Sequence, residues 1–277
     1  MQLRKVLIIG MILTTLIVLS GCISPPVATE SNERVTPESM NVKEFSLVTE
    51  DGITISVSHF LCGQPNVCIL AHGFMGSKHR PYITILSKRL SEHFDIITFD
   101  FRGHGASGGV VSGMKEIYDI KRVVDYAKNK GYEKIVLIGF SLGGIQSIYE
   151  ASKFHDIDAL VTVSVPADTE TIKSNAKWLF WMVNNPFGRI ILRPWARLGN
   201  VIEFPKPVTM IEQVSPIPLL ITQGTKDTLV DVEQAEILYQ KAKEPKELVI
   251  IEGMGHPPKL PEEFYDTVEE WLGKLLR

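Results

Sequence analysis

Residues 138–144 read IGFSLGG, so two glycines bracket Ser141 at the spacing G-x-S-x-G. This spacing alone carries little weight, because it arises by chance in about one chain in ten of this length. Its surroundings carry more: the sequence predicts an apolar strand over 134–139 and a helix from 142 to about 154. A serine on the sharp turn between a strand and a helix has the context of a nucleophile elbow, in which strained backbone exposes Oγ.

A serine hydroxyl is a weak nucleophile and needs a base. On a sheet of this kind the acid is expected after the serine along the chain, and the histidine after the acid. Asp227 and His256 each follow a predicted apolar strand, in that order. We therefore expect His256 to take the proton of Ser141 and Asp227 to orient the imidazole. Asp231 and Glu252 are the alternatives for the acid.

The oxyanion of a tetrahedral intermediate needs two N–H donors. One is expected from the backbone of Leu142, the residue after the serine, and the other from the loop after the predicted strand 66–71. Phe74 N–H is the preferred second donor, and Met75 N–H is the alternative.

Predicted strands and helices alternate over most of the chain from residue 44 onward. The interior strands are apolar on both faces, which is typical of a parallel sheet covered by helices on both sides. Two alternating runs joined at Asp51-Gly52 predict an antiparallel hairpin at one edge. The pattern predicts a mostly parallel sheet of about eight strands flanked by helices. Ligands in such sheets bind beyond the carboxyl ends of the strands.

The glycine-rich motifs together resemble a known family. They look like the α/β-hydrolase superfamily, in the family's order: HGF at 72–74, DFRGHG at 100–105, GFSLGG at 139–144, GTKD at 224–227 and GMGH at 253–256. The resemblance is to the branch that holds esterases, monoacylglycerol-lipase-like enzymes and serine-aminopeptidase-like proteins. It covers about residues 44–277 and implies the α/β-hydrolase fold and a Ser-His-Asp hydrolase. It does not identify the ester, amide or thioester.

The segment 168–215 interrupts the alternation of strands and helices. It holds three of the four tryptophans and four prolines, and residues 171–200 include five basic residues and no acidic one. We expect a small helical cap, which the resemblance matches to the part of the family that varies with substrate. Trp178, Phe180 and Trp181 are expected to line an apolar acyl pocket, or else to form the cap's own small core. The basic residues form a solvated face or contact anionic head groups.

Little in the sequence favours other ligands. The net charge of −3 argues against bulk attraction to nucleic acid, and there is no phosphate-binding glycine loop. No cofactor and no metal are expected, because H-E-x-x-H and clustered carboxylates are absent from the sequence. His72, His104 and Asp100 are expected to make structural hydrogen bonds in the glycine-rich loops.

Residues 1–21 have the order of a secretory signal peptide, with two basic residues and then an apolar run from Val6 to Leu19. The ending Leu-Ser-Gly-Cys22 resembles the lipobox of bacterial-type lipoproteins, which implies a cleaved signal and an acylated Cys22. The alternative is an uncleaved membrane anchor. Both place the globular part outside the cytoplasmic membrane and tethered to it. Residues 22–43 are polar and rich in proline, which predicts a tether, and the hydrolase domain is expected over 44–277.

Cys62 and Cys68 flank a turn-like cluster between two apolar strands. Across a short hairpin their side chains would face each other, and an extracytoplasmic compartment permits a disulfide. We expect that disulfide, with two reduced, half-buried thiols as the alternative, since spacing does not determine the Cβ distance.

The favoured function is hydrolysis of short or medium carboxylic esters, with a small-molecule ester or amide as the partner. A peptidase, amidase or thioesterase of the same fold would share the chemistry. An aminopeptidase would need an acidic group to hold the substrate ammonium, and the 171–200 stretch of the cap is basic. A non-catalytic binding lipoprotein is the third alternative, and the complete Ser, Asp, His order disfavours it.

Overall fold

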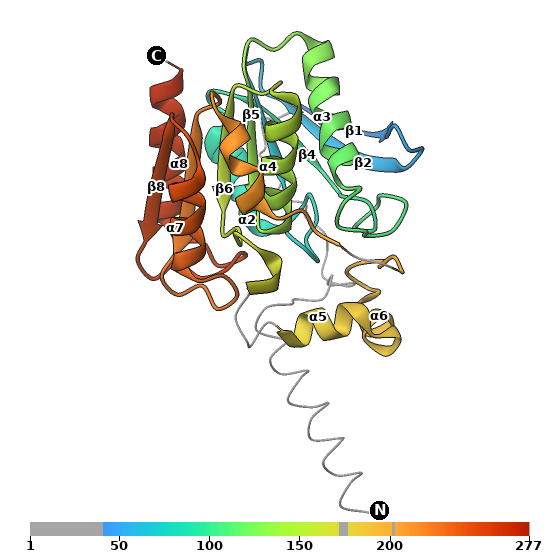
Figure 1. Cartoon of the computed structure of the whole chain (residues 1–277). Coiled ribbons are helices and arrows are strands. Elements are labelled where there is room, and N and C mark those ends of the chain that lie inside the picture. Colours follow the sequence, from blue (N-terminus) through green and yellow to red (C-terminus); the bar gives the residue numbers. More distant parts are fainter. Residues whose placement is uncertain (1–40, 172–176, 201–202, 277) are drawn as a thin grey trace, which may run out of the picture. The chain divides into compact units, whose positions relative to one another are not determined.

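The computed structural model describes residues 41–171, 177–200 and 203–276 (Figure 1). Eight described strands form one sheet in the order β1-β2-β4-β3-β5-β6-β7-β8. Their bounds are β1 (Asn41–Val48), β2 (Thr54–Leu61), β3 (Val67–Ala71), β4 (Asp95–Phe99), β5 (Ile135–Phe140), β6 (Ala159–Val163), β7 (Leu219–Gly224) and β8 (Lys246–Ile251). The first two strands form an antiparallel hairpin that pairs antiparallel with β4, and every pair from β4 to β8 is parallel. The predicted mostly parallel, eight-stranded sheet is confirmed.

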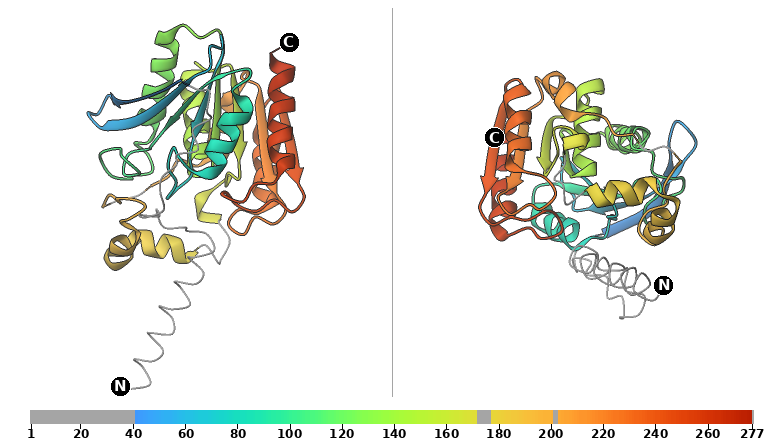
Figure 2. Two further views of the ribbon diagram at one scale, coloured as in Figure 1. Left: turned by 180° about the vertical axis from the view of Figure 1, so that it is seen from behind. Right: turned by 60° about the horizontal axis from the view of Figure 1, so that its bottom comes forward.

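Helices cover both faces of the sheet (Figures 1 and 2). The described helices are α2 (Pro81–Leu90), α3 (Ile117–Lys130), α4 (Leu142–Phe154), α5 (Lys177–Asn184), α6 (Pro186–Leu192), α7 (Val232–Lys241) and α8 (Glu262–Leu275). Buried side chains of α3, α4 and α7 form one core with the sheet, and those of α2 and α8 form a second core on the opposite face. The two cores draw on strands and helices from β1 to α8, so residues 41–277 contain a hydrophobic core of their own.

The helix and strand patterns explain these layers. All residues of β3, β4 and β5 are buried, as expected for strands covered on both faces. Helix α3 buries Ile120, Val123, Val124 and Ala127, which recur at helical spacing along one stripe. It ends at Gly131, whose φ of 79° is left-handed and favours glycine.

The sheet order contradicts the expected placement of the two cysteines. Strand β4 lies between β2 and β3, so Cys62 after β2 and Cys68 in β3 are not partners across a hairpin. Both are free thiols, and the expected disulfide is not formed. Cys68 is completely buried in the second core, and burial raises the pKa of its thiol. Burial, with the nearby Asp95 carboxylate, raises the pKa of Cys62 to about 11.

The cap segment contains two short helices, α5 and α6, which lie together at one end of the sheet (Figure 2). Later in the same segment, Ile211 and Val214 of the 3-10 helix η4 (Ile211–Val214) are buried in the first core, and so belong to the body rather than to a separate cap. In the described part of the chain no helix combines the length and apolarity needed to cross a bilayer.

Candidate active site

Ser141 lies on a strained turn between β5 and α4. Its φ of 50° and ψ of −111° are unusual for a residue with a side chain, and such geometry costs about 1–3 kcal/mol. A Cβ on Gly139 would lie 2.5 Å from Ser147 Oγ, and one on Gly143 would overlap the carbonyl of Ala71. Both glycines are therefore required by close packing at the turn, which holds the serine at the carboxyl end of the central strands.

His256 links Ser141 to Asp227. The imidazole Nε2 lies 3.2 Å from Ser141 Oγ, and Nδ1 lies 2.8 Å from Asp227 Oδ2. If Nδ1 carries the proton and donates it to the carboxylate, Nε2 is left as the acceptor for the serine hydroxyl. The three residues come from loops after β5, β7 and β8, so the parallel sheet brings them to one edge. Their hydrogen-bonded order is the one expected from the sequence.

Asp227 is buried and tightly held. Its Oδ1 accepts hydrogen bonds from the N–H groups of Leu229 and Val230, at 2.8 and 2.9 Å, and Gln223 Nε2 donates to its Oδ2 over 3.2 Å. Burial by itself would raise the pKa of Asp227, but the bond to His256 and these N–H donors outweigh it, so the pKa is lowered. The group is therefore an ionised, fixed acceptor for the imidazole.

The two donors expected for an oxyanion both line the same cavity as Ser141. These are Phe74 and Leu142, and neither backbone N–H has a hydrogen-bond partner in the described part of the chain. Met75 N–H, the alternative, is already donated to His104 Nε2 over 3.2 Å. The loop is close to the elbow, because a Cβ on Gly73 would lie 3.4 Å from the Cβ of Ser141.

His72 and His104 make structural hydrogen bonds, as expected. His72 Nδ1–H donates to Gly73 O over 2.7 Å, and His72 Nε2 accepts from Phe101 N–H over 3.1 Å. Burial lowers the pKa of His72 to about 4 and that of His104 to about 3, so both stay neutral near pH 7. Among the described residues no cluster of histidine, cysteine, aspartate or glutamate is arranged around a metal position.

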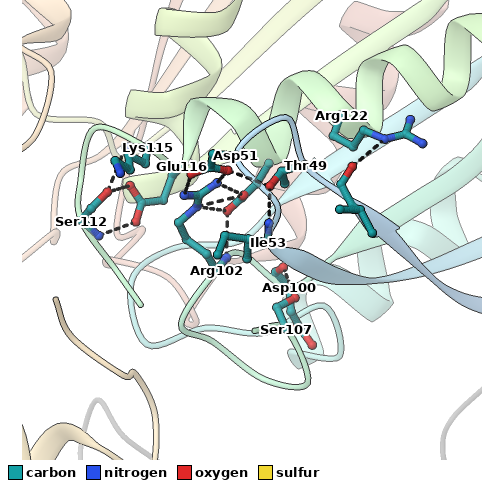
Figure 3. Close-up of polar contacts among 12 residues, drawn as sticks. Thr49, Asp51, Ile53, Asp100, Arg102, Ser107, Ser112, Lys115, Glu116 and Arg122 are labelled. Atoms are coloured by element: carbon teal, nitrogen blue, oxygen red, sulfur yellow. Dashed lines mark hydrogen bonds and ion pairs between the residues drawn. The ribbon is translucent and has the colours of Figure 1, made fainter. Parts of the chain in front are cut away.

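Arg102 anchors the loop that carries His104 (Figure 3). It is buried, and its guanidinium binds Asp51 bidentately at 2.7 and 2.9 Å and Asp119 at 2.8 Å. The hydrogen bonds from Arg102 lower the pKa of Asp51 to about 2. Asp100 accepts from the N–H groups of Lys78 and Ala106, as expected for a structural carboxylate. Together these bonds join the loops after β3 and β4.

An apolar cavity opens beside Ser141, with an empty volume of about 630 Å³ including its mouth. Among the described lining residues, three have polar side chains: Ser141, Thr169 and His256. The apolar lining residues are Phe74, Leu142, Ile145, Pro166, Leu179, Val183, Phe204, Leu229 and Val230. A cavity with such an apolar lining suits the acyl part of a small ligand.

The cap contributes to this cavity through residues that the sequence did not single out. Leu179 and Val183, four residues apart on α5, are on its wall, whereas Trp178 and Trp181 are not. Trp178 packs in a small cap core with Met182, and Trp181 is 61% exposed. The expectation that the tryptophans line the pocket is therefore not met. The side chain of Phe180 lies outside the described part of the structure.

The sequence reasoning also missed Gln223, which holds the acid, and the loop residues Leu229 and Val230, which both bind Asp227 and line the cavity. Their position directly around the GTKD motif is the signal that could have indicated them. Cys22 lies outside the described residues.

Comparison with known proteins agrees with this geometry. A family model described as alpha/beta hydrolase fold matches residues 66–189. The chain has the α/β-hydrolase fold. Its structure resembles the esterase Pf2001 of Pyrococcus furiosus, at a TM-score of 0.72 and 26% identity, over 91% of this chain and 99% of the esterase.

Two curated proteins are similar to this chain in sequence. The protein YfhR of Escherichia coli (strain K12) is 29% identical over 211 residues, which are 74% of this chain and 67% of YfhR. A proline iminopeptidase of Clostridioides difficile is 32% identical, but over only 90 residues, which are 31% of this chain and 30% of the peptidase.

Proposed function

We propose that this protein is a serine hydrolase that cleaves carboxylic esters of short or medium acyl chains. The observation that carries the proposal is the chain of contacts from Ser141 Oγ through His256 to Asp227, at 3.2 and 2.8 Å, at the wall of an apolar cavity. The similarity to the Pf2001 esterase, which covers nearly the whole of that protein, supports it.

In the proposed reaction Ser141 Oγ attacks the ester carbonyl carbon while His256 Nε2 takes the hydroxyl proton. The negative charge on the carbonyl oxygen is held by the N–H groups of Leu142 and Phe74. The intermediate collapses to an acyl-enzyme, and His256 gives its proton to the departing alcohol. Water, deprotonated by the same imidazole, then attacks the acyl carbon and releases the acid and the free serine. Asp227 stabilises the charged imidazolium in both halves.

The cavity favours an uncharged ester over an aminopeptidase substrate. An α-ammonium group would need a carboxylate close to the serine, and no described residue that lines the cavity carries one. The nearest acidic residues along the chain from the lining residue Thr169 are Asp168 and Glu170, and both pair with Lys206, at 3.0 and 3.2 Å. The peptidase match is confined to 31% of this chain and adds little against this charge argument.

The test is turnover of phenyl esters of increasing acyl length. Ser141→Ala should lower kcat by about 10⁶, because the acyl-enzyme cannot form. Ser152→Ala is the matched control, since Ser152 lies further along the same helix and bonds only to Tyr149 O over 2.9 Å. Turnover that persists in Ser141→Ala, or faster release of an aminoacyl amide than of any ester, would overturn the proposal.

We further propose that the protein is a lipoprotein tethered outside the cytoplasmic membrane through an acylated Cys22. The sequence LSGC at 19–22 supports this, after the basic residues and the apolar run that precede it. The intact mass of membrane-extracted protein should correspond to a chain that starts at Cys22 and carries a diacylglyceryl group. A mass that still includes Met1 would contradict the proposal.

A further inference from the structure

Exposed apolar side chains gather on the two cap helices. Eight large apolar residues are exposed in the described part of the chain, and four of them lie within residues 181–191. These four are Trp181 at 61%, Phe187 at 61%, Ile190 at 69% and Ile191 at 39%. The three largest exposed fractions among these eight residues are thus found here. Single exposed apolar residues are ordinary, whereas a group of them indicates an interaction surface.

The cap helices α5 and α6 present these residues outward while packing on each other. Phe187, Ile190 and Ile191 have the spacing i, i+3, i+4 and therefore share one face of α6. The opposite side of α6 carries the buried Gly188 and Leu192. A Cβ on Gly188 would overlap the backbone of Met182, so α6 lies directly against α5, as Figure 1 shows.

Helix α5 has an unbroken apolar run between its polar end residues, Lys177 and Asn184. Residues 178–183 read WLFWMV, with Leu179 and Val183 on the cavity wall and Trp181 exposed. The protein covers Leu179 and Val183 at the cavity, whereas the large apolar side chain of Trp181 is left exposed.

The charge around this surface indicates which kind of partner binds it. Residues 177–200 contain four basic residues and no acidic one: Lys177, Arg189, Arg193 and Arg197 are the basic residues. In the described part of the structure none of the three arginines pairs with a carboxylate. Arg189 binds the carbonyls of Val183 and Asn200, Arg197 binds that of Ser107, and the side chain of Arg193 is exposed. Among the described residues, no carboxylate therefore neutralises the positive charge of these arginines.

We propose that Trp181, Phe187, Ile190 and Ile191 form a docking surface for an anionic phospholipid bilayer, with the cap arginines beside the head groups. Aromatic and aliphatic side chains enter the boundary between head groups and acyl chains, and arginines bind lipid phosphates. A second copy of the chain is a less favourable partner, because its cap arginines would lie close to those of the first copy and repel them. The inference does not rest on ester hydrolysis, but it would place the α5 wall of the cavity at the lipid surface.

The test uses residues 41–277, so that binding cannot come from the N-terminal segment. This protein is sedimented with vesicles of phosphatidylglycerol and phosphatidylcholine in equal parts, and with vesicles of phosphatidylcholine alone. We expect binding to the anionic vesicles, and at least tenfold weaker binding in the double variant Phe187→Ser/Ile190→Ser. Ile85→Ser is the control, because Ile85 is also exposed, at 42%, but lies on α2. It should bind like the wild type.

Two companion measurements keep the outcomes distinct. Turnover of a water-soluble ester without vesicles should be equal in all three proteins, which shows that the variants are folded. If wild type binds no vesicles, or if the double variant binds as well as wild type, the docking surface is wrong even with turnover intact. If gel filtration shows a dimer that the double variant dissociates, the surface is a contact between copies and the proposal fails. Vesicle binding without any turnover would count against the proposed function alone.

Discussion

Met75 donates its backbone N–H to His104 Nε2 over 3.2 Å, and this bond joins the loop after β3 to the loop after β4. His104 is held from its other side, because Nδ1–H donates to Arg102 O over 3.1 Å. Because Met75 N–H already donates to His104, Phe74 N–H is the free one of the two candidates for the second oxyanion donor. His104 is thus a positioning residue for the proposed oxyanion site, and it acts through the loop rather than on the substrate.

Replacing the His104 ring removes Nε2, the acceptor for Met75 N–H, and should lower kcat more than it changes KM. Loss of an oxyanion donor costs about 10²–10³ in kcat, and an indirect displacement should cost less, about 10–100-fold, in His104→Leu. His104→Gln places an amide oxygen near the former Nε2 and should recover part of the loss. Steady-state kinetics on one ester measures both variants. An equal loss in the two, or a loss carried by KM, would contradict the positioning role.

The two aspartates of the loop after β7 should differ sharply. Asp227→Asn removes the carboxylate that orients His256, and kcat should fall about 10⁴-fold. Asp231→Asn is the matched change, since Asp231 lies at the start of α7 and was the alternative acid. It should change kcat by only a few fold. A larger effect at Asp231 would reverse the assignment of the acid.

Arg102 should matter for stability far more than a surface arginine. Arg102→Ala leaves the buried Asp119 carboxylate without its cation, and such a loss costs about 3–5 kcal/mol of unfolding free energy. Arg122→Ala is the control, because Arg122 Nε donates an exposed hydrogen bond to Val48 O over 3.0 Å (Figure 3). It should change stability by less than about 0.5 kcal/mol. Urea denaturation compares them, and similar midpoints would show that the Arg102 network contributes little.

Glu150 on α4 should make stability fall as pH rises. It is fully buried, and burial, then the neighbouring Asp156, raises its pKa from 4.5 to about 9. A raised folded-state pKa contributes stability that is present below pH 4.5 and is lost as pH rises toward 9. Glu150→Gln cannot ionise, so it should be about 1–3 kcal/mol more stable than wild type at pH 8 and show no gain at pH 4.

Thermal unfolding across this pH range checks the prediction for Glu150. Glu247→Gln serves as the control, because Glu247 is exposed on β8 and its change should alter the melting temperature little. A gain in Glu150→Gln that does not grow with pH would contradict the raised pKa.

The fold was predictable from the sequence because its signals are local. The apolar strands, the amphipathic stripe of α3 and the glycines around Ser141 each depend on neighbouring residues, and the parallel topology follows from their alternation. The sheet order was not predictable in the same way. The insertion of β4 between β2 and β3 separates Cys62 from Cys68, and nothing in the short stretch between them signals it.

The site was predictable where chemistry demands a residue type, and less so where packing decides. Ser141, Asp227 and His256 follow strand ends in an order that loops on one sheet edge can bring together. The direction of the cap side chains depends on how α5 rotates against the body. Leu179 and Val183 face the cavity and Trp181 does not, which apolarity alone could not distinguish because residues 178–183 are all apolar.

The most direct test of the central claim is labelling with a fluorophosphonate, followed by mass mapping of the labelled peptide. If Ser141 is a nucleophile activated by His256, the adduct should lie on Ser141, be absent in Ser141→Ala and form much more slowly in His256→Asn. The exposed histidine variant His93→Asn should label like the wild type. A label on any other residue, or equal labelling of Ser141→Ala, would contradict the assignment of Ser141 as the nucleophile.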